Sequence, residues 1–205
     1  MAEGSPLGMS AFAASRLPVP DELRTTRLLL RRWRPADALQ LEPILAENFN
    51  RLGPWIPRRV AEPAPVERLA QRLTEFSAAF DAGREWRYGV FALDTSRIVG
   101  ELDLFPRDGS GRVAFENADH IEIGYWLRAE ATGQGHATEA ARAALDVALT
   151  LPGISRVAIH CDERNASSAA VPRRLGFQLA ATVTELAMTP GDADVRLQIW
   201  EYARP

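Results

Sequence analysis

The sequence predicts a mixed α/β fold in which helices pack on a central sheet. Residues 121–127 place apolar side chains on every second position, which is typical of a strand. Residues 66–80 instead repeat apolar side chains at helical spacing. A Gly-rich turn, residues 132–137, joins the strand directly to an Ala-rich helical run. The chain has 205 residues, which is enough for one domain with a full core.

The N-terminal half predicts one strand and two helices. Residues 25–33 are predicted to form the strand. A helix over residues 35–47 begins with a proline, which suits the first turn of a helix. Residues 51–65 contain four prolines and therefore predict a loop. The second helix covers residues 66–80.

The C-terminal half supplies most of the strands. Residues 86–93 and 97–105 predict a hairpin, and residues 106–117 a polar loop. Beyond the strand at 121–127, five further segments and a turn complete the order β-α-α-β-β-β-α-β-α-β-β: helix 135–150, strand 156–161, helix 168–175, strand 177–188, turn 189–194 and strand 195–202.

Composition excludes several classes of protein. Hydrophobic residues make up 46% and charged residues 25%, and the net charge of −3 gives no field for binding nucleic acid. The apolar runs are too short to span a membrane. The single cysteine, Cys161, fits a reducing cytoplasm, where we expect the protein to act. The three histidines show no metal-ligand spacing, so no metal is expected.

The N-terminal segment differs in composition from the rest. Residues 1–20 are rich in Ala, Ser, Gly and Pro and carry no basic region followed by an apolar core, which argues against a signal peptide. We interpret residues 1–20 as a disordered or tag-like tail and residues 21–205 as one domain.

The Gly-rich turn at 132–137 is a candidate phosphate site. Glycines let a backbone approach a ligand closely, and the free N–H groups and dipole of a helix N-terminus favour an anion. The turn lacks the spacing of a dinucleotide fingerprint and the Gly-Lys-Ser/Thr of a P-loop. A plain turn before a helix therefore remains an alternative on this feature alone.

Three motifs in order carry a resemblance to a known family. They are Ile-Glu-Ile-Gly-Tyr-Trp-Leu at 121–127, Gly-Gln-Gly-His-Ala-Thr-Glu-Ala at 133–140, and Asn165 to Phe177 with Asn-x-x-Ser and Leu-Gly-Phe. Together they resemble the GCN5-related N-acetyltransferase (GNAT) superfamily, and most closely its Rim-type branch. Leu-Gly-Pro-Trp at 52–55 is similar to a loop of that branch. The resemblance covers about residues 22–203.

The resemblance implies a fold and a cofactor. The fold would be a mostly antiparallel sheet of about seven strands flanked by about four helices, with a splayed pair of parallel strands at 121–127 and 156–161. Acetyl-CoA would be the acetyl donor. Its pyrophosphate would bind the turn, where Thr132 departs from the usual Arg or Gln. The implied cofactor-binding residues are Tyr125, Trp126, Leu127, Thr132, Gly133, Gln134, Gly135, His136, Ala137, Thr138, Asn165 and Ser168.

Acetylation of an amine needs a base, and three carboxylates are candidates. Glu122 lies on the strand beside the implied cofactor arm, and Glu101 lies on a neighbouring predicted strand. Glu185 resembles an acidic residue of the Rim-type branch. A solvated surface carboxylate is the alternative interpretation of Glu122 and of Glu101.

The leaving thiolate needs a proton donor. Many relatives use a tyrosine of the short helix, but Pro172 occupies that position here. The Rim-type branch instead has the serine of Asn-x-x-Ser, which is Ser168. Its alternative role is to cap the helix, although Ser167 is the better cap by position.

The amine acceptor would lie among aromatic side chains and acidic groups. Trp55, Trp86, Tyr88 and Glu101 are predicted to contact it, and Trp126 is a further aromatic of the same region. Core packing is the alternative for each aromatic, least so for Trp55 in its Pro-rich loop. Acidic residues between Asp81 and Glu122 could attract a cation, or simply form a solvated surface.

Two function classes stay open at this point. The first is an acetyl-CoA-dependent N-acetyltransferase, acting by direct transfer on a small-molecule amine, an antibiotic or a protein N-terminus. The second is a non-catalytic module that binds or senses acyl-CoA. Neither class predicts a nucleic acid or a membrane as a partner. The resemblance implies that the protein could form a homodimer.

Overall fold

The computed structural model describes residues 19–185 and 194–203. The mixed α/β prediction is confirmed: nine strands form one sheet in the order β1-β2-β3-β4-β6-β7-β9-β8, with β5 beside β4. Residues 1–18 of the predicted tail lie outside the described residues. Of its last two residues, Val19 is buried in the core, and the Pro20 carbonyl accepts a hydrogen bond of 2.8 Å from the Tyr88 hydroxyl.

The N-terminal half differs from its prediction at three places. The strand expected at 25–33 begins only at Leu28, as β2, and a separate strand, β1, precedes it, because the backbone turns at Thr25, whose hydroxyl accepts from the Leu28 N–H. The first helix continues to Leu52, and the Pro-rich loop contains a short helix. The elements are β1 (Glu22–Arg24), β2 (Leu28–Arg32), η1 (Pro35–Asp37), α1 (Ala38–Leu52), α2 (Arg58–Ala61) and α3 (Val66–Asp81).

The remaining strands follow the predicted order. The sheet has more strands than the expected seven because the short β1 and β5 extend it. The predicted strand end at Met188 and the turn after it lie outside the described residues. The elements are β3 (Trp86–Ala92), β4 (Ile98–Asp108), β5 (Gly111–Arg112), η2 (Phe115–Asn117), β6 (His120–Leu127), η3 (Ala129–Ala131), α4 (His136–Ala148), β7 (Arg156–Asp162), α5 (Ala166–Leu175), β8 (Gln178–Glu185) and β9 (Val195–Ala203).

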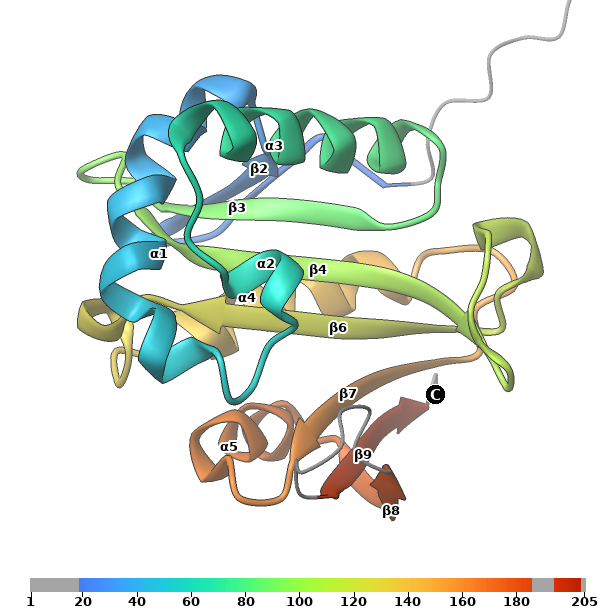
Figure 1. The fold of residues 1–205 in the computed structure, drawn as a ribbon. Coiled ribbons are helices and arrows are strands. Elements are labelled where there is room, and N and C mark those ends of the chain that lie inside the picture. Colours follow the sequence, from blue (N-terminus) through green and yellow to red (C-terminus); the bar gives the residue numbers. More distant parts are fainter. Residues whose placement is uncertain (1–18, 186–193, 204–205) are drawn as a thin grey trace, which may run out of the picture.

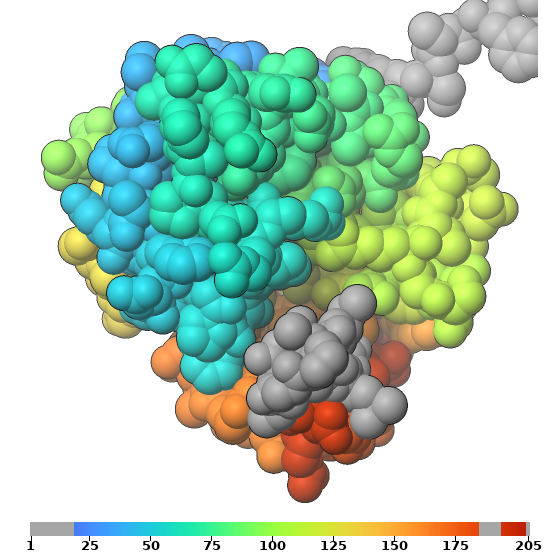
Figure 2. Space-filling view, viewed as in Figure 1, coloured from blue at the N-terminus to red at the C-terminus, as the bar shows by residue number. Residues whose placement is uncertain are grey.

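Helices cover both faces of the sheet. In Figure 1, α1 and α3 lie in front of the sheet and α4 behind it. Alanines at the buried positions of α4, among them Ala140, Ala141 and Ala144, let this helix approach the strands closely. Trp33 and Trp126 instead pack with α1 and α3 on the front. Figure 2 shows α1, α2 and α3 covering the upper part of the front face.

The parallel pair β6–β7 separates part-way along its length. Its ladder joins His120 to Arg156 and ends with Glu122 opposite Ala158, although both strands continue. On its other edge, β6 stays paired with β4 as far as Leu127. Beyond Glu122, β7 turns away toward α5, as Figure 1 shows. The splayed parallel pair is therefore present, and it leaves one edge of β6 open.

Candidate active site

The turn before α4 has the geometry of an anion cradle. Gly133 and Gly135 adopt φ values of 73° and 83°, which side chains disfavour. Gly135 is the N-cap of α4 and supplies no side-chain acceptor to the helix. The first N–H groups of α4 have no carbonyl one turn earlier within the helix, so they are directed outward. The positive end of the helix dipole lies at the same place.

A side-chain brace ties this turn to β2. Arg27 donates from Nη1 to the Gln134 carbonyl at 3.0 Å and pairs with Glu139 of α4 at 2.6 Å. Thr25 also donates to Glu139 at 2.6 Å. Partial burial raises the pKa of Glu139, but the hydrogen bonds from Thr25 and Arg27 lower it below its usual range. Glu139 therefore stays ionised and keeps Arg27 in place.

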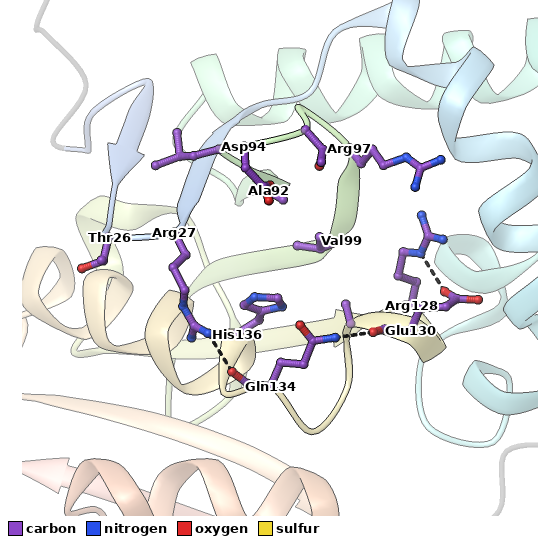
Figure 3. A pocket seen from close by; sticks show the side chains of 13 residues that line it. Thr26, Arg27, Ala92, Asp94, Arg97, Val99, Arg128, Glu130, Gln134 and His136 are labelled. Carbon is purple, nitrogen blue, oxygen red and sulfur yellow. Dashed lines mark hydrogen bonds and ion pairs between the residues drawn. The ribbon is translucent and has the colours of Figure 1, made fainter.

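Figure 3 shows the pocket of about 560 Å³ that adjoins this brace. Arg27 and Gln134 meet at its edge, and Gln134 also donates to the Glu130 carbonyl at 2.5 Å. Thr132, the predicted departure from the family pattern, donates its hydroxyl to the Ala129 carbonyl at 2.7 Å. The Thr132 side chain thus holds the turn to the backbone of η3.

The open edge of β6 presents backbone groups toward β7. The Arg128 N–H donates to the Val99 carbonyl at the start of β4 at 2.9 Å. Because the backbone N–H and C=O groups of successive residues in a strand point to opposite edges, those of Trp126 point to β4 as well. Those of Tyr125 and Leu127 then face the side on which β7 has separated. The Leu127 carbonyl accepts a hydrogen bond from Arg51 of α1. The backbone groups that can meet a ligand here are those of Tyr125 and the Leu127 N–H, whereas Trp126 is not placed to contribute its own.

Ser168 and Tyr125 meet where α5 crosses this opening. The Ser168 hydroxyl donates to the Tyr125 oxygen at 3.2 Å, and the Tyr125 hydroxyl donates to the Ser168 carbonyl at 2.9 Å. Burial raises the pKa of Tyr125, so the phenol keeps its proton. Burial also raises the pKa of the neighbouring Cys161 thiol, which makes it a poor nucleophile. The two hydroxyls form a protonated pair beside the open strand edge.

The cap of α5 differs from the prediction. Asn165, not Ser167, is the N-cap, and its Oδ1 accepts the Ser168 N–H at 3.1 Å. The helix consequently begins two residues before the predicted start at 168. The Asn165 side chain, predicted to contact the cofactor arm, holds the helix end that carries Ser168. Ser167 is exposed, and the Ser168 hydroxyl contacts Tyr125 and does not cap the helix.

Replacing Ser168 tests its predicted role as the proton donor. We expect Ser168→Ala to lower kcat by about 100-fold, the usual contribution of a positioned proton donor, with little change in the KM for acetyl-CoA. Ser167→Ala, one residue away and exposed, is the matched control and should keep the wild-type kcat. Steady-state rates of thiol release measure both. Equal rates for the two variants would leave the Ser168 hydroxyl a structural role only.

The candidate bases Glu122 and Glu101 are both held by arginines. Glu122 forms an ion pair with Arg107, and Glu101 lies 3.1 Å from Arg87. Glu101 also accepts the Trp33 indole N–H at 2.7 Å and is only 2% exposed. Glu101 is therefore part of the buried framework, which removes it from contact with an acceptor. The third candidate, Glu185, ends β8 opposite Val195, and its side chain lies outside the described residues.

Most of the acidic residues that suggested a cation-attracting region have basic partners. Arg87 contacts three carboxylates, those of Glu85, Glu101 and Asp103. Burial raises the pKa of Asp103 well above its usual range, against the attraction of Arg87. Further pairs join Asp81 to Arg32, Glu85 to Arg112, and Asp119 to Arg156. These carboxylates therefore already have cationic partners within the protein.

The predicted aromatic residues divide into core and surface. Trp86 and Tyr88 are fully buried among the strands, so neither offers surface to an acceptor, and core packing accounts for both. Trp126 is 5% exposed and packs with α1 and α3. Trp55 is 41% exposed and follows the end of α1, whose Arg51 binds the end of β6. Trp55 is the one predicted aromatic that remains available.

Comparison with known proteins agrees with this geometry. The family model described as "Acetyltransferase (GNAT) domain" matches residues 27–178. The chain belongs to the GNAT acetyltransferase family. The match spans β2, the α4 turn, the open β6–β7 pair and α5.

Individual relatives place the chain near the Rim-type branch. It is 29% identical over 154 residues to a Bacillus subtilis (strain 168) protein named "Putative ribosomal N-acetyltransferase YdaF", covering 73% of this chain and 77% of that one. The fold matches the microcin C7 self-immunity acetyltransferase MccE with TM-score 0.77 and 17% identity, covering 92% and 99% of the chains. It matches the ribosomal L7/L12 acetyltransferase RimL, in complex with coenzyme A, with TM-score 0.72 and 22% identity, covering 87% and 95%.

The GNAT protein is therefore an acyltransferase that uses acetyl-CoA as its co-substrate, as the three motifs predicted. The residues fit such a donor, because the α4 turn offers N–H groups to phosphates and β6 offers an unpaired edge to an extended amide-containing arm. Within the described part of the chain, no group of three metal-ligating side chains is placed to hold an ion. No described helix is long and apolar enough to cross a membrane.

Proposed function

We propose that this GNAT protein transfers an acetyl group from acetyl-CoA directly to the α-amine at a protein N-terminus. The observation that carries the proposal is that the buried and partly buried carboxylates of the sheet front already have arginine partners, Arg87 for Glu85, Glu101 and Asp103, and Arg107 for Glu122. A polycationic drug or a polyamine needs an uncompensated acidic pocket. An α-amine carries one charge and loses its proton more readily than an alkyl amine. The name of the relative YdaF refers to a ribosomal N-acetyltransferase, which agrees with this acceptor.

Each part of the site has a role in this reaction. The N–H groups of Gly133 to Thr138 bind the pyrophosphate, with Arg27 and Glu139 fixing the turn. The backbone of Tyr125 and the Leu127 N–H bind the arm and the thioester carbonyl, where an N–H stabilises the developing oxyanion. Ser168, supported by Tyr125, protonates the leaving thiolate. Trp55 lies beside the path of the peptide.

A thiol-release screen tests the acceptor. Purified protein is incubated with acetyl-CoA and with N-terminal peptides, polyamines, amino acids or aminoglycosides, each at equal concentration. We expect the highest kcat/KM with a peptide that has a free α-amine. A preference for polyamines or aminoglycosides would support the small-molecule alternative instead. Binding of acetyl-CoA in calorimetry without thiol release from any amine would support the non-catalytic module.

A further inference from the structure

The last turn of α1 brings an arginine to the open end of β6. Helix α1 ends beside the C-terminal end of β6, as Figure 1 shows. Arg51 lies in that last turn and donates from Nη2 to the Leu127 carbonyl. The N–H and C=O groups of one strand residue point to the same edge of the strand, so the guanidinium lies on the edge that β7 leaves open. Arg51 therefore lies beside the Leu127 N–H, the backbone donor that is proposed to bind the thioester carbonyl.

Asn48 fixes the position of this guanidinium. Asn48 is 2% exposed, and its Nδ2 donates to the Ile44 carbonyl at 2.9 Å. Its Oδ1 accepts from Arg51 Nη2 at 3.2 Å and from the Ala129 N–H at 2.8 Å. Asn48 thus joins α1, the arginine and the backbone that follows β6 in one network. A donor that is held in place in advance does not have to reorganise when charge develops beside it.

Arg51 keeps N–H groups for a ligand. A guanidinium carries five N–H donors on three nitrogens. Both hydrogen bonds of Arg51 to described residues use Nη2, which leaves Nε and Nη1 for a ligand. Partial burial lowers the pKa of Arg51, against the attraction of Glu130, yet a guanidinium stays charged throughout the physiological pH range. A permanent positive charge with N–H groups to donate therefore lies at the open end of β6.

We propose that Arg51 is a catalytic residue whose guanidinium donates to the thioester carbonyl oxygen together with the Leu127 N–H. This inference rests on the proposed function, which supplies the reaction. The carbonyl oxygen gains negative charge when the amine attacks, so a cation held beside it stabilises the transition state more than the neutral thioester. The same positive charge disfavours an ammonium at this place and favours the neutral amine.

The reaction forms a C–N bond and breaks a C–S bond. The α-ammonium first releases one proton to water, and the neutral amine attacks the thioester carbon. The carbonyl oxygen takes up the electron pair of its double bond while Arg51 and Leu127 donate to it. When this pair returns, the C–S bond breaks and the thiolate takes a proton from the Ser168 hydroxyl, which regains through solvent the proton that the nitrogen loses. The net products are the acetylated amine, coenzyme A and one proton.

Steady-state kinetics with the best peptide from the acceptor screen compare Arg51→Met with wild type. We expect kcat to fall by about 100-fold, the scale for the loss of one donor to an oxyanion, with little change in the KM for acetyl-CoA. Arg51→Lys keeps the charge but not the planar fork, so its loss should be smaller. Arg24→Met removes an exposed arginine of β1 and is the control, which should keep the wild-type kcat. A wild-type kcat for Arg51→Met would overturn the proposal.

Infrared difference spectra of bound acetyl-CoA give a second readout that needs no amine. The acetyl carbonyl carries the heavy stable isotope of carbon, and its stretching frequency falls as its oxygen is polarised. We expect a lower frequency on the wild type than for free acetyl-CoA, and a return toward the free value in Arg51→Met, or in Arg51→Lys if the Met variant does not fold. Equal frequencies in wild type and variant would leave Arg51 only a bracing role and overturn the proposal. A lowered frequency on a wild type that is inactive with every amine would support this contact and contradict the proposed function instead.

Discussion

We expect Gly135→Asp to abolish measurable binding of acetyl-CoA. The substitution places a carboxylate at the N-cap of α4, inside the turn whose N–H groups are proposed to bind the pyrophosphate. A Cβ at this position would lie 3.5 Å from Arg27 Nη2, so the new carboxylate also competes for the arginine that braces the turn. Repulsion between the new carboxylate and the pyrophosphate weakens acetyl-CoA binding, and so does the disturbed contact of Arg27 with the turn. Isothermal titration with acetyl-CoA measures the loss.

Gly135→Asn is the control that separates charge from backbone strain. Residue 135 has φ 83°, a conformation that Asn and Asp adopt more readily than other side chains, at similar cost. We expect Gly135→Asn to bind acetyl-CoA more weakly than wild type but far more tightly than Gly135→Asp. Equal affinities for the two variants would mean that no phosphate lies against this turn.

We expect Arg87→Met to lower the free energy of unfolding strongly. Arg87 is 3% exposed and is the shared partner of Glu85, Glu101 and Asp103. Its removal leaves buried carboxylates without their cation, which costs about 3–5 kcal/mol when one partner of a buried pair is lost. A loss of this size is a large fraction of the stability of a single domain. Chemical denaturation monitored by circular dichroism measures it.

The pH dependence of the stability of Arg87→Met tests whether the ionised Asp103 carboxylate causes the loss. Burial raises the pKa of Asp103 above its unfolded value, and the loss of Arg87 raises it further. A folded pKa above the unfolded one means that stability falls as pH rises from the unfolded pKa toward the folded one. Arg87→Met should therefore be closer to wild type in acid than at neutral pH. Arg58→Met, on an exposed pair with Glu62, should leave the unfolding midpoint unchanged.

Local signals in the sequence predicted the parts of the fold that depend on local order. The helical spacing of apolar residues over 66–80 predicted α3, and the Gly-rich turn followed by alanines predicted α4. Both signals lie within a short segment of the sequence and do not depend on distant partners. The strand at 25–33 was wrong in one respect. It begins only at Leu28, because the backbone turns at Thr25, whose hydroxyl bonds Glu139, a partner more than a hundred residues away in the sequence.

Long-range partners also explain what the sequence did not predict about the site. Trp86 and Tyr88 have the same residue types as ligand-lining aromatics, and only their place within the sheet makes them core. Glu101 was a candidate base because it lies on a strand next to that of Glu122, but Arg87 and Trp33 enclose it. The nearness of His160 to Glu122 could not be predicted from the sequence, because it arises from the register of β6 and β7.

The most direct test of the proposed activity is to map the acetylated atom. Two peptides of identical sequence, each with an internal lysine, are incubated with the protein and acetyl-CoA, one with a free N-terminus and one with a blocked N-terminus. Mass spectrometry with fragmentation locates the new acetyl group. We predict acetylation of the free α-amine and none of the blocked peptide. Acetylation of the lysine in both peptides, or of neither peptide while small amines are acetylated, would contradict a protein N-terminus as the acceptor.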